Sequence, residues 1–182
     1  MQRMKIIHLE KVDSTQTYAK NHYTEFAPEA ITCISADEQT AGRGRFQRKW
    51  IAPKGKNISA TFYFQLPASI PHLTTLAQLM AYTLAGVIGI HSQIKWPNDI
   101  LLSGKKLAGI LCETIFESSV VHCFLGIGIN VNTTPEELAI IDQPATSLFI
   151  ETQREWDRDT LLSELGKRWI EQLEKFKKEN II

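Results

Sequence analysis

The chain has 182 residues, of which 43% are hydrophobic and 22% charged, and its 20 Lys and Arg balance its 20 Asp and Glu. This length and composition predict one globular domain, spanning residues 1–182, with a sizeable buried core. Zero net charge argues against a diffuse basic surface for DNA or RNA. The N-terminus lacks the apolar stretch of a signal peptide, and no apolar run could cross a bilayer, so we expect a cytoplasmic protein without a membrane partner.

The hydrophobic patterns predict strands and helices in a mixed order. In chain order we expect a strand at Lys5–Leu9, a helix start at Asp13–Gln16, strands at Ile31–Ala36 and Asn57–Leu66, a helix at Pro71–Ile90, strands at Gln93–Trp96, Ile100–Leu102, Lys106–Thr114 and Val120–Ile127, and a helix at Asp157–Lys178. Strict alternation in Asn57–Leu66 predicts a strand with one buried face. Residues 133–146 read as a linker with room for a short helical turn.

Most of these strands are joined by tight turns, and this predicts an α+β fold: a mixed, mostly antiparallel sheet with helices packed on one face. The three cysteines, Cys33, Cys112 and Cys123, lie in apolar strand-like stretches without a CxxC spacing, so we expect buried reduced thiols. The histidines show no zinc-binding spacing.

The segment Gln39–Trp50, with the sequence QTAGRGRFQRKW, is the most distinctive part of the chain. Residues 43–56 hold six Lys or Arg and no Asp or Glu, so the remainder of the chain carries six excess negative charges. Glycines allow the backbone to approach a ligand closely, and arginines donate to carboxylate or phosphate. The segment therefore suits an anion, although a solvated surface loop or an RNA-binding tag would share this composition.

A second group of polar residues follows the expected short strands. Lys95-Trp-Pro-Asn-Asp99 can present Asn98 and Asp99 to a ribose, an amine or Mg²⁺, or these two can serve only as turn formers. Lys106 stands in an apolar strand, where it either reaches water or points into a pocket. Residues 126–130 form a GxGxN cluster, in which glycines often only permit close packing.

Together these residues suit a nucleoside triphosphate bound beside a carboxylic acid. The chain lacks a P-loop, a dinucleotide fingerprint and an obvious nucleophile–base pair. Charge stabilisation and orientation of two bound reactants, as in adenylation, would then carry the chemistry.

In order and spacing, five segments resemble the catalytic domain of biotin protein ligases (biotin–[acetyl-CoA-carboxylase] ligases): Asp13–Gln16, Gln39–Arg45 with Arg48–Trp50, Lys95–Asp99, Lys106–Leu111 and Gly126–Asn130. The resemblance implies that the biotin carboxylate attacks the α-phosphate of ATP, giving biotinyl-5′-AMP and pyrophosphate. A lysine of the biotin carboxyl carrier protein then takes the biotinyl group. Mg²⁺ is the implied metal, with Asp99 as its ligand.

By position, the resemblance implies roles for particular residues. The biotin ring system would be hydrogen-bonded by Ser14, Thr15 and Gln39. The loop over biotin and the adenylate would be formed by Gly42, Arg43, Gly44 and Arg45. Trp50 would pack beside the nucleotide, and the backbone would lie against biotin at Gly109 and Gly126. The phosphates, Mg²⁺ and adenine would be surrounded by Asn98, Asp99 and Asn130. The catalytic charges would come from Lys106, Arg43 and Arg45.

Many members of this family also carry an N-terminal helix-turn-helix domain and a C-terminal β-barrel, and neither is expected in residues 1–182. We therefore expect no DNA partner, and we leave a homodimer open. Two alternatives remain: a lipoate ligase or octanoyltransferase of similar fold, and a non-catalytic biotin-binding protein. RNA binding through the arginine-rich loop is a more distant alternative.

Overall fold

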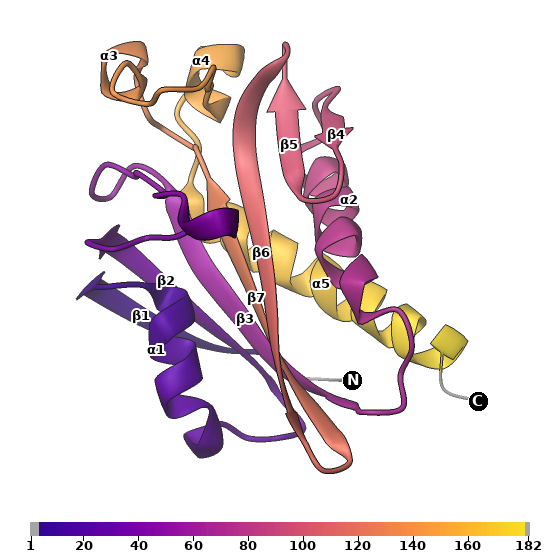
Figure 1. The fold of residues 1–182 in the computed structure, drawn as a ribbon. Coiled ribbons are helices and arrows are strands. Elements are labelled where there is room, and N and C mark those ends of the chain that lie inside the picture. The colour runs from indigo at the N-terminus through magenta and orange to yellow at the C-terminus, as the bar shows by residue number, and fades with distance from the viewer. Residues whose placement is uncertain (1–3, 181–182) are drawn as a thin grey trace.

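The computed structural model describes residues 4–180, and in this range seven strands form a single sheet (Figure 1). The strands are β1 (Met4–Val12), β2 (Ile31–Gln39), β3 (Ile58–Pro67), β4 (Gln93–Lys95), β5 (Asp99–Leu102), β6 (Lys105–Glu117) and β7 (Val120–Ile129). Their order across the sheet is β1-β2-β3-β7-β6-β5-β4. Only β1 and β2 pair in parallel, and the other neighbours are antiparallel. The predicted mixed, mostly antiparallel α+β fold is confirmed.

Helices and short 3₁₀ turns connect and cover the strands. They are α1 (Thr15–His22), η1 (Tyr23–Glu25), η2 (Arg45–Gln47), η3 (Leu73–Thr75), α2 (Leu76–Ile88), α3 (Pro135–Leu138), α4 (Leu148–Thr152) and α5 (Arg158–Asn180). Helix α2 begins five residues after Pro71, so the prediction of Pro at the helix start was wrong, whereas the short turn expected in residues 133–146 is present as α3.

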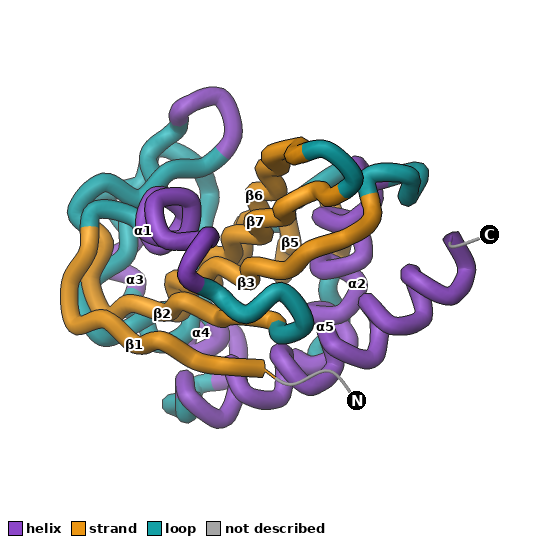
Figure 2. Tube along the Cα trace, turned by 90° about the horizontal axis from the view of Figure 1, so that it is seen from below, coloured by secondary structure: helices purple, strands orange, loops and turns teal. Residues whose placement is uncertain are grey.

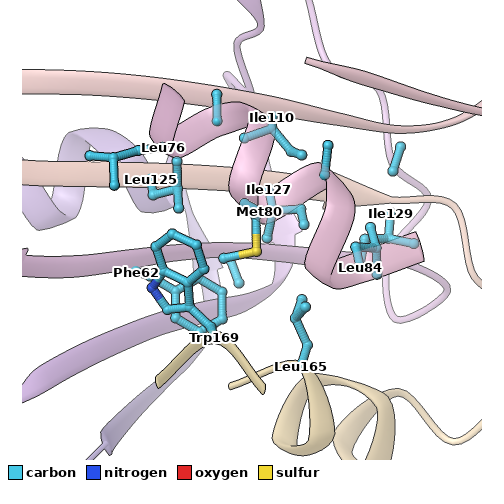
Figure 3. Close-up of a cluster of buried hydrophobic side chains, with 14 of the residues drawn as sticks. Phe62, Leu76, Met80, Leu84, Ile110, Leu125, Ile127, Ile129, Leu165 and Trp169 are labelled. Atoms are coloured by element: carbon cyan, nitrogen blue, oxygen red, sulfur yellow. The ribbon is translucent and has the colours of Figure 1, made fainter. Parts of the chain in front are cut away.

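The main core lies between the sheet and the two long helices α2 and α5. Phe62 of β3, Leu84 of α2 and Trp169 of α5 are fully buried there, together with the even-numbered residues of β3 (Figure 3). Burying such large apolar side chains supplies most of the driving force for this packing.

Helix α1 covers the opposite face of the sheet, so the helices do not all lie on one face (Figure 2). Ala19 of α1 packs there with Ile34, Tyr63 and Phe124 in a second, smaller core. Consequently β3 is buried on both faces, and the prediction that only one of its faces is buried was wrong. The alternating polar residues were misleading because Thr61 faces other polar groups rather than water.

The three cysteines are free thiols. Cys33 and Cys123 are buried as expected, whereas Cys112 is only partly buried. Burial raises the pKa of the Cys33 thiol to about 12, and burial with the neighbouring Glu113 charge raises that of Cys112 to about 12. These thiols therefore stay protonated and unreactive near neutral pH. Within residues 4–180, no helix is both long and apolar enough to cross a membrane.

Candidate active site

A cavity of about 240 Å³ opens on the sheet face that carries α1. The loop after β2, the turn between β4 and β5, and strands β6 and β7 contribute its walls. Of the site residues expected from the sequence, it is lined by Ser14, Thr15, Gln39, Arg43, Gly44, Arg45, Trp50, Asn98, Asp99, Lys106, Gly109 and Gly126. Segments that are far apart in the chain therefore converge on one cavity.

The lining is strongly cationic. Among the described residues, the basic ones that line the cavity are Arg43, Arg45, Arg48, Lys49, Lys95 and Lys106, and the one acidic side chain is Asp99. Low-dielectric walls strengthen the field of such a cluster, so the cavity favours carboxylate or phosphate.

The arginine-rich loop is tied down at both sides of the cavity. Arg43 Nη2 donates to Thr17 Oγ1 on α1 at 2.9 Å, and Arg45 Nη1 donates to Asn98 Oδ1 at 2.9 Å. The guanidinium of Arg45 also lies 5.0 Å from the ring centroid of Phe46, whose side chain is 80% exposed. The loop thus spans the cavity from α1 to the β4–β5 turn.

Trp50 lies against the glycine pair that faces the cavity. Gly109 of β6 and Gly128 of β7 are directly opposite each other in the sheet. A Cβ added to Gly128 would come within 2.2 Å of the Trp50 ring, so glycine is needed for this contact. The indole Nε1 is buried and has no hydrogen-bond partner within residues 4–180, which leaves one donor available.

Lys106 is held in place at the start of β6. Its backbone N–H donates to Pro144 O and its carbonyl accepts from Thr146 N–H, each at 2.9 Å. Its Nζ lies 3.0 Å from Asp99 Oδ1, and both side chains are about one-fifth exposed. Asn98 Nδ2 donates to the same carboxylate oxygen at 3.2 Å. The ammonium therefore points toward the cavity rather than away to water.

Polar groups at the start of α1 also line the cavity. Ser14 is the N-cap of α1 and accepts from the backbone of Thr17. The Thr15 backbone N–H donates to Gln39 Oε1 at 2.8 Å. Ser14 and Thr15 are nearly buried, so hydrogen bonds made to a ligand here would be shielded from water.

A second cavity of about 490 Å³ adjoins the first. The two share a wall of Arg48, Lys49, Trp50, Lys106 and Gln143. Beyond this wall, the second cavity is lined by Ile51, Asn130 and residues 140–142 and 145. Two ligands, one in each cavity, would thus meet at Lys106.

Comparison with known proteins agrees with this arrangement. The sequence profile described as the biotin/lipoate A/B protein ligase family matches residues 9–130. The chain belongs to this ligase family.

Relatives of this ligase family include the bifunctional ligase/repressor BirA of Bacillus spizizenii, 39% identical over 162 residues that cover 84% of this chain and 49% of the relative. The biotin–[acetyl-CoA-carboxylase] ligase of Mycobacterium tuberculosis is 37% identical over 72% of this chain and 50% of the relative. A biotin protein ligase from Aquifex aeolicus, solved in complex with biotin and ATP, superposes with a TM-score of 0.77 at 35% identity, covering 97% of this chain and 73% of that one. The chain spans about half the length of the curated relatives it matches.

Two residues expected to bind ligand in this ligase-family domain do not line the first cavity. Gly42 is buried beneath it, where an added Cβ would meet Trp50 O at 2.8 Å and Gln39 Nε2 at 2.9 Å, so its role is to let the loop close. Asn130 lines the second cavity, and its amide is bonded to Asn57 and to Thr146 O. Asn130 therefore joins the end of β7 to the segment that holds Lys106.

The sequence analysis missed several residues that line the first cavity in this ligase-family fold. They are Gln16, Phe46, Thr61, Lys95, Trp96, Gly128 and Gln143, among others. Gln16 was expected only as part of a helix start, but the cap is Ser14 and the Gln16 amide turns into the protein. Gly128 was visible in the GxGxN cluster, whereas Thr61 and Gln143 stand outside the motifs and gave no signal.

Proposed function

We propose that this chain catalyses the ATP-dependent attachment of biotin to a lysine of a biotin carboxyl carrier protein, through biotinyl-5′-AMP. The observation that carries the proposal is the meeting of two cavities at Lys106, beneath a cationic loop. Family membership and the structural likeness to a biotin protein ligase solved with biotin and ATP support the choice of reactants.

In this proposal biotin occupies the first cavity. Its ring system lies against Ser14, Thr15 and Gln39, and its chain runs past Gly109 and Gly126 toward Lys106. Glycine is needed at Gly126, where an added Cβ would lie 2.6 Å from Gln16 Oε1, and an added Cβ at Gly109 would lie 3.3 Å from the Lys106 side chain. The carboxylate then lies where the positive charge is concentrated.

ATP occupies the second cavity, with its α-phosphate at the shared wall. A carboxylate and a phosphate repel each other, so their approach requires cations on both sides. Lys106 stabilises the charge that builds up as a carboxylate oxygen bonds to the α-phosphorus and pyrophosphate leaves. Arg43 and Arg45 hold the loop over the resulting mixed anhydride, which excludes water from it.

Mg²⁺ is part of the proposal, because the residues present could hold it together with the substrate phosphates. Mg²⁺ is commonly held by one or two carboxylates together with substrate phosphates and water. Asp99 meets that need, because its Oδ1 takes the contacts from Lys106 and Asn98. Asp99 would hold the metal through its second oxygen, Oδ2. Bound Mg²⁺ would neutralise phosphate charge.

In the second step, the lysine amine of the carrier protein attacks the biotinyl carbonyl, and AMP leaves. We place this reaction in the cytoplasm, where ATP is available. A lipoate ligase would use the same type of site, since the family profile includes both biotin and lipoate ligases.

The test is pyrophosphate release from ATP and Mg²⁺ with biotin, lipoate or octanoate as the acid. We expect release with biotin alone. Pyrophosphate release with lipoate or octanoate but not with biotin would show that one of these acids is the substrate. Binding of biotin without pyrophosphate release would indicate a non-catalytic biotin-binding protein.

A further inference from the structure

We infer that Gln16 is a positioning residue that fixes the direction of the hydroxyl protons at the α1 end of the first cavity. By doing so it makes the Thr15 hydroxyl an acceptor for a ligand N–H group. The inference rests on the proposed function, because it states which groups donate and which accept hydrogen bonds where the biotin ring system is proposed to lie.

Gln16 is 5% exposed and reaches from the first turn of α1 across the sheet. Its Nε2 lies 3.0 Å from the Phe124 carbonyl oxygen and 3.0 Å from Glu113 Oε2. A carbonyl accepts and an ionised carboxylate accepts, so both neighbours demand the NH₂ end of the amide. Lys20 Nζ lies 3.1 Å from the other oxygen of Glu113, so this carboxylate is paired with a cation.

The opposite end of the Gln16 amide is therefore its oxygen. Thr61 Oγ1, which is fully buried, lies 3.1 Å from Gln16 Oε1. Because an amide oxygen can only accept, this contact requires the Thr61 hydroxyl proton to point at Gln16. Thr61 then offers only lone pairs to its other neighbour.

That other neighbour is Thr15, whose Oγ1 lies 2.9 Å from Thr61 Oγ1 and 3.1 Å from Gln39 Oε1. Gln39 Oε1 already accepts the Thr15 backbone N–H, so it is also an acceptor. The one hydroxyl proton of Thr15 is thus retained within the protein network. Toward the cavity, Thr15 presents a lone pair.

The geometry therefore gives a chain of donations from Thr61 to Gln16 and from Gln16 to Glu113, while the Thr15 proton goes to Thr61 or to Gln39. Since Gln39 Oε1 faces Thr15, the Gln39 NH₂ group is the end left to donate elsewhere. A cyclic urea carries N–H groups next to a carbonyl. One N–H group can donate to the Thr15 hydroxyl oxygen, and the carbonyl can accept from a donor such as the Gln39 NH₂ group. A Thr15 hydroxyl that was free to rotate could also donate, so it would select less strongly for a ligand N–H group.

The experiment compares biotin with a carbamate analogue in which the ureido N–H assigned to Thr15 is replaced by oxygen. Dissociation constants are measured by calorimetry for the wild type and for Gln16→Met, which keeps size but removes the amide. The Thr61 proton then turns to Thr15 and occupies its lone pair. We expect biotin binding to weaken about 10-fold and analogue binding by less than about twofold. Equal weakening of both ligands, or of neither, would overturn the inference.

A double-mutant cycle tests the route through Thr61. In a Thr61→Val background no proton is available to be redirected, so Gln16→Met should cause no further loss of biotin affinity. Losses that simply add would contradict the route. If Gln16→Met does not fold, Gln16→Leu removes the same amide and should give the same selective loss of biotin affinity; equal weakening of biotin and the analogue in that variant counts against the inference.

Gln65→Met provides the matched control. Gln65 is a partly buried glutamine on β3 that donates to the Tyr63 hydroxyl at 2.9 Å, and it does not line the cavity. Its substitution should leave both affinities unchanged, and thermal unfolding confirms that each variant is folded. Failure of the wild type to bind biotin would reject the proposed function itself, whereas normal wild-type binding with no selective change in Gln16→Met rejects only this inference.

Discussion

The ammonium of Lys106 and the carboxylate of Asp99 form an ion pair 3.0 Å long at the wall shared by the two cavities. Asp99 thereby holds the lysine in position before any substrate carboxylate arrives. A substrate anion and a metal ion that enter together would replace this pair by two new ones, since the anion takes Lys106 and the metal takes Asp99. In the proposed reaction the site would then exchange charges without leaving either group unpaired.

Lys106→Ala should slow formation of the adenylate much more than it weakens binding of preformed biotinyl-AMP. The ammonium matters most while charge accumulates on the α-phosphate, and loss of such a group costs about 10²–10³ in rate. Pyrophosphate release measures the first step, and calorimetry measures binding. Lys105→Ala is the neighbouring control, because Lys105 does not line the cavity. Normal pyrophosphate release by Lys106→Ala would remove Lys106 from the chemistry.

Arg45→Gly should still make the adenylate but release it into solution. The change removes the guanidinium that bonds Asn98 at 2.9 Å and adds backbone freedom to the loop. Free adenylate acylates lysines on any protein, so a bystander protein incubated with the reaction should be labelled more strongly than with the wild type. The control is Arg154→Gly, at an arginine stacked on Trp156 outside the cavity. Bystander labelling equal to that of the wild type, with pyrophosphate still released, would show that Arg45 does not retain the intermediate.

Gly128→Ala should reduce ligand binding by displacing Trp50. The added Cβ would lie within 2.2 Å of the indole ring, so the ring must leave the sheet. We expect biotin affinity to fall about 5- to 150-fold, which corresponds to the about 1–3 kcal/mol that overpacking costs. Gly86→Ala is the control, since nothing lies within 4 Å of the Cβ added there and alanine favours the helix. Unchanged affinity in Gly128→Ala would mean that the position of Trp50 is irrelevant to binding.

Asp37 should make stability depend on pH in the acid range. Burial tends to raise the pKa of this carboxyl, but hydrogen bonds from Arg158 and His8 outweigh it, so the pKa lies below its ordinary value of 3.8. The stabilisation is present above 3.8 and is lost as pH falls through the lowered pKa. Asp37→Asn should therefore cost about 1 kcal/mol of unfolding free energy at neutral pH and less as the solution is acidified. Denaturant unfolding at several pH values checks this, and a difference that does not change with pH would contradict it.

Local patterns were enough to predict most of the strands and the residues that gather at the site. The arginine-rich loop and the Lys95–Asp99 turn each keep their functional groups close together in the chain, so their composition alone was informative. Long-range packing could not be read in the same way. The burial of Thr61 depends on α1 crossing the sheet above it, and the contact of Trp50 with Gly128 joins residues 78 positions apart. Gln16 gave no signal as a site residue because its partners on β6 and β7 lie 97 and 108 residues away.

The proposed function requires that biotin be activated at Lys106 and then transferred to a carrier lysine. The most direct measurement incubates the protein with labelled biotin, ATP and Mg²⁺, and follows label both in biotinyl-AMP and on a purified biotin carboxyl carrier domain. We predict that adenylate forms first, that one lysine of the carrier is then labelled, and that both signals require ATP. Labelling of the carrier without adenylate formation, or adenylate that never passes to the carrier, would contradict the account.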